Sequence, residues 1–155
     1  TRSWLDRHRK PSGSEALPRR SAAVTLPGMW IYILLGSGLG GLARYLVATG
    51  VQRLGGGSLP YGTLVVNVAG ALLIGALLRH ALMAPAMSAE LRTFLIVGIC
   101  GGFTTFSAFS AETFELLRTG SWGTAVAYAL TSVVLCVAAT AAGFALGGSQ
   151  RLAAP

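Results

Sequence analysis

The chain has 155 residues, of which 53% are hydrophobic and only 11% are charged, and its mean hydropathy is +0.64. Ordinary soluble domains carry roughly 25% charged residues, so this composition indicates one small membrane-embedded bundle. The formal charge of +7 does not favour a nucleic-acid-binding protein, because half of the twelve basic residues precede every apolar segment: Arg2, Arg7, Arg9, Lys10, Arg19 and Arg20.

Residues 1–28 combine Pro, Ser, Gly and Arg without hydrophobic periodicity, which predicts a disordered basic N-terminal tail. The first methionine is Met29, at the edge of the first apolar run, and the segment before it lacks the apolar stretch of a secretory signal. We therefore favour upstream or added sequence over a functional arm. A four-helix domain is expected over residues 29–148, followed by a short C-terminal tail over residues 149–155.

Four apolar segments follow the tail, each near the ~20 residues that a helix needs to cross a bilayer. They cover residues 29–48, 62–78, 93–117 and 122–146. Short connections rich in Gly, Ser and Pro separate them. The predicted fold class is an all-α, multi-pass membrane protein with four transmembrane helices. Cys100 and Cys136 fall inside these segments and are interpreted as small buried side chains rather than as a disulfide pair.

The first two spans each carry a polar residue that calls for an explanation. Arg44 lies near the end of the first span, where it either anchors the helix at the interface beside Tyr45 or makes an entrance favourable for an anion. Asn67 stands in the middle of the second span and must find a partner, either on a neighbouring helix or in a permeating solute. Thr63 lies one turn earlier on the same face.

The third span contains the sequence GICGGFTTFSAFSAE at residues 98–112, where glycines and hydroxyl side chains interrupt an apolar run. A helix in a bilayer breaks only where protein or a wet cavity receives the freed backbone groups. The sequence therefore predicts a broken helix near Gly101 to Thr105, and a site at the break.

Beyond the predicted break, Phe106 and Phe109 share a helix face. Phenylalanines at this spacing usually pack against a core or lipid, but the positive edge of an aromatic ring can also approach an anion. Glu112, two residues after Ser110, is either a carboxylate at headgroup level or part of a solute pathway.

The fourth span has a polar stripe at four-residue spacing: Tyr128, Ser132, Cys136 and Thr140. Hydroxyl side chains in membrane helices often bond back to the carbonyl four residues earlier, which would make the stripe a structural feature. Alternatively, the four side chains line a wet track across the membrane.

Outside the tail, the basic residues of the loops are almost balanced. Arg79, Arg92 and Arg151 lie on one side of the membrane, and Arg53 and Arg118 lie on the other. Because Lys and Arg in short loops set orientation, such a body can insert both ways round and form antiparallel dimers. The basic tail opposes this, since it should hold every N-terminus in the cytoplasm.

These motifs resemble the Fluc/CrcB family of fluoride channels over residues 29–146. The elements GGLARY, GTLVVNVAGALLIG and GGFTTFSAFSAE match segments of that family in order and spacing, and the stripe that begins with Tyr128 and Ser132 follows them. The thiol of Cys136 departs from the pattern, because a hydroxyl would serve better in a polar stripe.

The resemblance implies a fluoride-selective channel of the bacterial inner membrane that exports fluoride passively. It implies a homodimer of oppositely inserted copies with two pores and a structural sodium ion at its centre, held by main-chain oxygens of Gly101 and Thr104. Phe106 and Phe109 would be ring-edge ligands and Asn67 the pore amide. The other implied pathway residues are Thr63, Ser110, Glu112, Tyr128, Ser132 and Thr140, with Arg44 at an entrance.

Two other functional classes fit the sequence less well. A small multidrug or guanidinium-type exporter also has four short helices, but such proteins resemble antiporters built on a glutamate in the first span, which here has no acid. An enzyme is not expected, because His8 lies in the tail, His80 lies in a loop, and no nucleophile, base and acid converge in the sequence.

Overall fold

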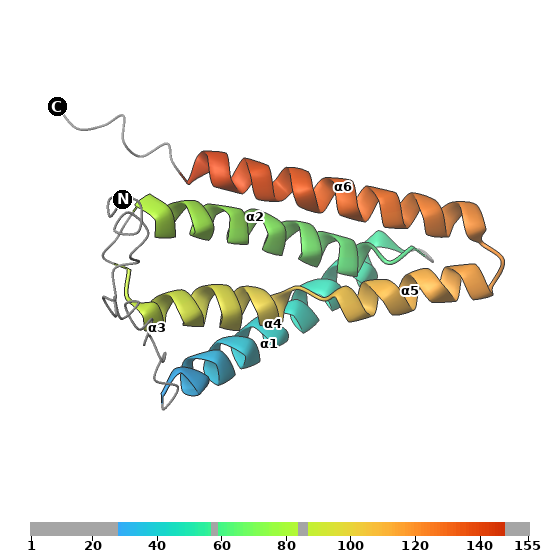
Figure 1. The fold of residues 1–155 in the computed structure, drawn as a ribbon. Coiled ribbons are helices and arrows are strands. Elements are labelled where there is room, and N and C mark those ends of the chain that lie inside the picture. Colours follow the sequence, from blue (N-terminus) through green and yellow to red (C-terminus); the bar gives the residue numbers. More distant parts are fainter. Residues whose placement is uncertain (1–27, 57–58, 84–86, 148–155) are drawn as a thin grey trace, which may run out of the picture.

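The structure, a computed structural model, describes residues 28–56, 59–83 and 87–147, and every regular element in these ranges is a helix (Figure 1). The elements are α1 (Met29–Gly55), α2 (Tyr61–Met83), α3 (Ala89–Arg92), the π-helical η2 (Thr93–Cys100), α4 (Gly101–Phe103), α5 (Phe106–Arg118) and α6 (Trp122–Leu146). Elements α3 to α5 together form one interrupted span. The described part thus contains four helices long and apolar enough to cross a membrane, as predicted. The predicted tails at residues 1–28 and 149–155 lie outside the described residues, apart from Gly28.

The first helix is longer than predicted, since α1 continues past residue 48 to Gly55. Its last turn is tied to the start of α2 by Gln52, whose Nε2 donates to the Leu59 carbonyl at 3.0 Å and whose Oε1 accepts from the Gly62 N–H at 3.2 Å. Gly56 then ends the helix in the left-handed conformation that favours glycine, with φ of 46°. The predicted end was wrong because the apolar run stops before the helix does. The second helix is also longer than predicted, so Arg79 and His80, which were expected in a loop, lie within α2.

Helices α2 and α6 run side by side over most of their length (Figure 1). Glycines allow this close approach. A Cβ atom on Gly75 would collide with the Thr140 carbonyl oxygen, and one on Gly143 would collide with the carbonyl oxygen of Leu72. Close backbone contact between small residues is the usual basis of helix association in membranes, where the hydrophobic effect does not separate protein from lipid.

Helix α1 crosses the third span beside its interruption (Figure 1). A Cβ atom on Gly36 would lie only 2.8 Å from the Gly98 Cα, and one on Gly102 would lie 2.8 Å from the Ser37 Cα. From the other side, Gly70 of α2 leaves room for the Thr104 methyl group. The break is therefore held between α1 and α2 in the middle of the bundle.

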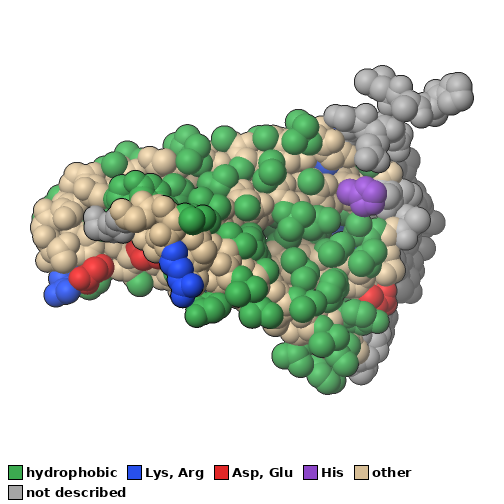
Figure 2. Space-filling model, turned by 180° about the vertical axis from the view of Figure 1, so that it is seen from behind, with side chains coloured by type: hydrophobic (Ala, Val, Ile, Leu, Met, Phe, Trp, Pro, Cys, Tyr) green, Lys and Arg blue, Asp and Glu red, His purple; other side chains and the backbone are tan. Residues whose placement is uncertain are grey.

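The surface of this single chain is strongly apolar. Large side chains such as Leu34 (63% exposed) and Val134 (62% exposed) stand out from the helices, and few residues form a buried core. Hydrophobic side chains cover much of the face in Figure 2, while the charged groups visible there lie mostly toward its ends. Exposed apolar area on this scale requires a bilayer or a partner as its surroundings.

Candidate functional site

The third span is interrupted at Thr104 and Thr105, whose backbones are extended. The interruption lies within the predicted range but is narrower, because Gly101 to Phe103 remain helical as α4. Glycine permits an irregular backbone but does not impose one, so the two glycines of this range stay helical. The Thr105 hydroxyl caps α5 by accepting from the Ala108 N–H at 3.1 Å, which restarts the helix.

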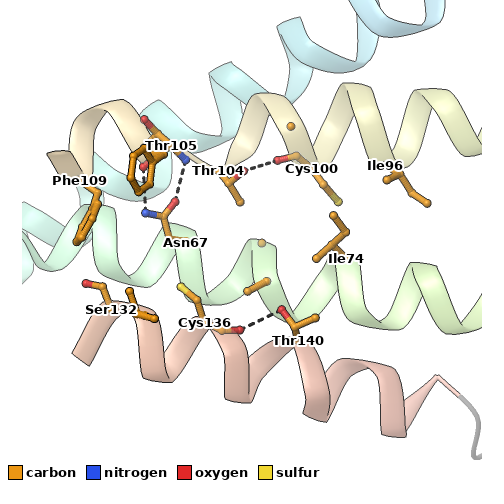
Figure 3. A pocket seen from close by; sticks show the side chains of 15 residues that line it. Asn67, Ile74, Ile96, Cys100, Thr104, Thr105, Phe109, Ser132, Cys136 and Thr140 are labelled. Carbon is orange, nitrogen blue, oxygen red and sulfur yellow. Dashed lines mark hydrogen bonds between the residues drawn. The ribbon is translucent and has the colours of Figure 1, made fainter. Parts of the chain in front are cut away.

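Asn67 holds the break open. Its Nδ2 donates to the Thr105 carbonyl at 3.1 Å, and its Oδ1 accepts from the Thr105 N–H at 2.8 Å (Figure 3). The amide therefore satisfies both backbone groups of an extended residue in the membrane interior, where an unpaired group is costly. This is the helix-bridging role left open by the sequence. One Nδ2 hydrogen remains for another acceptor, because an amide nitrogen carries two.

A cavity of about 390 Å³ lies beside the break, between α2, the third span and α6 (Figure 3). It brings together most of the residues singled out in the sequence: Asn67, Gly101, Thr104, Phe106, Phe109, Ser132, Cys136 and Thr140. The rings of Phe106 and Phe109 have their centroids 5.5 Å apart, which confirms that they share a face. We call this space the central cavity.

The hydroxyl groups around the central cavity differ in their hydrogen bonds. Thr140 donates to the Cys136 carbonyl at 3.0 Å, and Ser110 donates to the Phe106 carbonyl at 2.8 Å, so both bond back along their own helix. Ser110 is also exposed and is not among the residues that line the cavity. In contrast, the buried Ser132 Oγ has no hydrogen-bond partner among the described residues.

Glu112 joins three helices through its carboxylate. The Thr63 hydroxyl of α2 donates to Oε1 at 2.6 Å, and the Tyr128 hydroxyl of α6 donates to Oε2 at 2.7 Å. Hydrogen bonds to an ionised carboxylate are short and about twice as strong as neutral ones. Glu112 is half-buried and therefore links hydroxyl groups of two neighbouring helices. The Phe109 ring packs against Tyr128, with 5.4 Å between centroids, which connects this group to the central cavity.

Arg44 lies beside the break. Its Nη1 approaches the Thr104 carbonyl oxygen at 3.5 Å. It also lines a second cavity of about 550 Å³ between α1, α2 and the start of α5, to which Thr63, Thr105 and Ser107 contribute. Thr105 lines both cavities, so the break contributes to the walls of both.

Sequence reasoning did not single out the roles of Thr105 and Ser107. Their hydroxyl oxygens lie 3.2 Å apart at the first turn of α5. A threonine directly before a helical run is a known capping signal, so the position of Thr105 was open to prediction. Its pairing with Asn67 was not, because the two residues are 38 positions apart.

The backbone around the break bears on the implied cation. The N–H of Thr105, which would pair with the Gly101 carbonyl in an unbroken helix, donates to Asn67 instead. The Gly101 carbonyl is thus released from that partner, and main-chain oxygens are hard ligands suited to small cations. The Thr104 carbonyl lies nearby but also meets the Arg44 guanidinium. These two carbonyl oxygens are chemically suited to bind a cation. A single chain, however, supplies too few of them to surround one.

The family described as CrcB-like protein, Camphor Resistance (CrcB), matches residues 31–144. The chain belongs to the CrcB family. The fluoride-specific ion channel FluC of Geobacter sulfurreducens is 52% identical over 105 residues, which cover 68% of this chain and 85% of that protein. FluC 1 of Nitrobacter hamburgensis is 47% identical over 117 residues, covering 74% and 93%. FluC of Agrobacterium fabrum is 43% identical over 115 residues, covering 74% and 92%.

Membership in the CrcB family confirms the resemblance drawn from the three motifs. It also separates this chain from the multidrug exporters that were the alternative. The relatives are named as ion channels, so the chain belongs with transport proteins and not with enzymes, as expected. Four membrane-capable helices and channel relatives together make it a multi-pass membrane protein.

Proposed function

We propose that this CrcB-family chain is a fluoride-selective channel that lets fluoride leave the cytoplasm passively across the bacterial inner membrane. The names of relatives at 43% to 52% identity support the ion. The observation that carries the proposal is the break held by Asn67, because it places neutral hydrogen-bond donors beside a cavity in the middle of an apolar bundle.

The donors of the central cavity suit a small, strongly hydrated anion. A selective pore must replace the water around fluoride, and the wall offers the second Asn67 Nδ2 hydrogen, the Ser132 hydroxyl and the ring edges of the two phenylalanines. Conduction also requires that the ion leave easily. Neutral donors meet this need, whereas a lysine in the narrow part would hold the anion too firmly.

Glu112 acts as a positioning residue in this proposal. Its carboxylate holds the hydroxyl hydrogens of Thr63 and Tyr128, so these donors stay oriented without an anion present. A passing fluoride competes with the carboxylate for the same hydrogens. Thr140 and Ser110 contribute in the same way only when their hydrogens turn from the backbone carbonyls toward the ion.

Arg44 provides positive charge at an entrance. Arg44 lines the second cavity, which shares Thr105 with the central cavity. A cationic group in a cleft with low-dielectric walls raises the local concentration of anions. Because it stands beside the break and outside the central cavity, it attracts fluoride without becoming a deep trap.

A second, oppositely inserted copy completes the site. Phe106 lines the central cavity and yet is 78% exposed, so one chain leaves this wall uncovered. A homodimer of antiparallel copies would cover it and create two equivalent pores. At the centre of that dimer, the Gly101 and Thr104 carbonyls of both copies would hold a structural sodium ion.

The test of the function is ion release from liposomes that contain the purified full chain. We expect rapid fluoride efflux and little chloride efflux, measured with ion-selective electrodes and compared with protein-free liposomes. Equal release of both anions, or none of either, contradicts a fluoride-selective channel.

The sodium proposal has a separate test. Exchange of sodium for a large organic cation should weaken the dimer and reduce fluoride efflux, because main-chain oxygens from two copies would lose their shared ligand. The measurement is the dimer fraction in detergent by light scattering, with flux as a second readout. If neither the dimer fraction nor the fluoride efflux depends on sodium, the structural sodium ion is contradicted, while the proposed channel function still stands.

A further inference from the structure

Arg79 carries a positive charge that no described carboxylate neutralises. It is half-buried and lies on α2, one turn before that helix ends at Met83. Its guanidinium carbon lies 5.2 Å from the centroid of the Phe144 ring on α6, which is a cation–π contact. In the part of the chain that the structure describes, its buried Nε has no hydrogen-bond partner and the guanidinium forms no ion pair. A guanidinium carries five N–H donors, so this group still needs an acceptor.

Arg79 stands near the edge of the bilayer rather than at its centre. It follows Tyr61, the first residue of α2, by eighteen positions, which is about 27 Å along a helix that rises about 1.5 Å per residue. The hydrocarbon core of a bilayer is about 30 Å thick. Helices α2 and α6 end at the same side of the bundle (Figure 1). The guanidinium therefore lies at the depth where phospholipid headgroups begin.

The stem of Arg79 packs against the end of α6. A Cβ atom on Gly147, the residue that caps α6, would lie 3.1 Å from the Arg79 Cβ. Basic side chains near the end of a helix often bond to its last carbonyls. The Arg79 Nε makes no such bond. The end of α6 thus positions the guanidinium without satisfying it.

The surface next to Arg79 is apolar. Leu72 and Val137 lie seven residues before Arg79 and Phe144, on the same faces of α2 and α6 and closer to the middle of the membrane, and both are exposed. None of these four residues lines the central cavity, so this surface is not the wall that a second copy is proposed to cover. An occupant of this place needs an acceptor at one end and apolar chains at the other.

We propose that Arg79 binds the phosphate of an anionic phospholipid, whose acyl chains lie along Leu72 and Val137. A guanidinium binds two phosphate oxygens through parallel hydrogen bonds, and basic sites between transmembrane helices bind anionic headgroups. An anionic lipid fits better than a zwitterionic one, because a choline group would bring a second positive charge beside an arginine that no described carboxylate pairs with. The proposal does not depend on which ion the chain conducts.

The test adds dioleoyl phosphatidylglycerol to the purified full chain in neutral detergent and measures lipid binding by native mass spectrometry. Dioleoyl phosphatidylcholine has the same acyl chains and a phosphate but no net charge, and inorganic phosphate has no acyl chains. We expect phosphatidylglycerol to bind about fivefold more tightly than phosphatidylcholine, the factor expected for one basic residue at an anionic headgroup. Millimolar inorganic phosphate should leave this binding unchanged.

Three variants locate the site. Arg79→Gln should lower the affinity for phosphatidylglycerol to that for phosphatidylcholine, because the charge and the planar fork are both lost. Arg79→Lys should keep part of the difference, since it retains the charge alone. The matched control is Arg92→Gln, which removes an exposed charge from α3 at the same end of the bundle and should not change binding (Figure 1). Thermal unfolding without added lipid reports whether each variant is folded.

Equal binding of the two lipids, or unchanged binding of phosphatidylglycerol to Arg79→Gln, overturns the lipid site. Equal losses in Arg79→Gln and Arg92→Gln also overturn it, because they indicate attraction by the total surface charge. Displacement of phosphatidylglycerol by inorganic phosphate replaces the lipid site with a site for free anions. If Arg79→Gln does not fold, Arg79→Lys and the comparison of lipids on the unaltered chain still decide the proposal.

Discussion

At the scale of single residues, one amide connects the fold to the candidate pathway. Asn67 satisfies both backbone groups of Thr105, which allows the third span to interrupt inside an apolar bundle. The same side chain lines the central cavity with one hydrogen still available. A substitution at this position therefore tests the structural and the conducting role together.

Asn67→Asp should abolish fluoride efflux. The carboxylate keeps an acceptor for the Thr105 N–H, but it loses the donor to the Thr105 carbonyl and repels an anion in the cavity. Efflux from liposomes measures conduction, and size-exclusion chromatography reports whether the variant is still folded. A folded variant with full efflux would limit Asn67 to bridging helices.

Tyr128→Phe removes one of the two hydroxyls that donate to Glu112. Side-chain hydrogen bonds between membrane helices contribute about 0.6–1.7 kcal/mol, so we expect a loss of stability within that range and slower fluoride efflux. Thermal unfolding in detergent measures the first effect. The matched control is Tyr32→Phe on α1, outside this group, which should change neither quantity. Unchanged unfolding and efflux in the Tyr128 variant would show that the Glu112 cluster is dispensable.

At the scale of elements, glycines decide which helices pack together. The α2–α6 pair depends on Gly75, where an added Cβ would collide with the Thr140 carbonyl oxygen and lie 2.9 Å from the Phe144 nitrogen. Both obstacles are backbone atoms, which cannot move aside as a flexible side chain can. The pair also positions the Ser132 and Thr140 stripe opposite Asn67, so its packing controls the cavity.

Gly75→Ala should therefore destabilise the chain by about 1–3 kcal/mol, the usual cost of overpacking a tight contact. The measurement is thermal unfolding, together with the yield of monodisperse protein. Gly50→Ala is the matched control within α1, because a Cβ there has no neighbour within 4 Å. Equal stability of the two variants would contradict the close contact between α2 and α6.

At the scale of the whole molecule, two features affect orientation in the membrane differently. The basic residues of the four-helix body favour both orientations, whereas the N-terminal tail favours one. By the order of the spans in the sequence, three basic residues are expected on one side of the four-helix body and two on the other, which favours insertion both ways round. One of the three, Arg79, lies within α2 with its guanidinium over the Phe144 ring, so the balance is closer still. With residues 1–28 attached, six additional basic residues against Asp6 and Glu15 should hold the N-terminus inside. An antiparallel dimer needs both orientations.

Deletion of residues 1–28 should therefore preserve or raise fluoride efflux per unit of protein. Single-cysteine labelling, in a background without the two native thiols, should find the ends of the truncated chain on both faces of the membrane. Labelling from one face only, with efflux intact, would refute dual insertion.

The sequence by itself determined the membrane class, the four spans, the presence of a break in the third and the polar residues that required partners. These features are local: span length, mean hydropathy and an interrupted apolar run follow from consecutive residues, because a bilayer demands that each segment satisfy its own backbone. Span length and hydropathy did not predict that α1 extends to Gly55, because this extension depends on the hydrogen bonds between Gln52 and the start of α2.

Only the tertiary structure decided where the third span breaks and which partners the polar groups take. Asn67 pairs with Thr105 across 38 positions, and Thr63 meets Glu112 across 49. Periodicity identifies the face of a helix but not the helix that it meets. The same limit applies to the stripe on α6, where Ser132 and Thr140 follow the same four-residue spacing. The Thr140 hydroxyl donates to the carbonyl of its own helix, whereas the Ser132 hydroxyl makes no such bond. The packing of neighbouring helices, rather than the spacing within one, sets that difference.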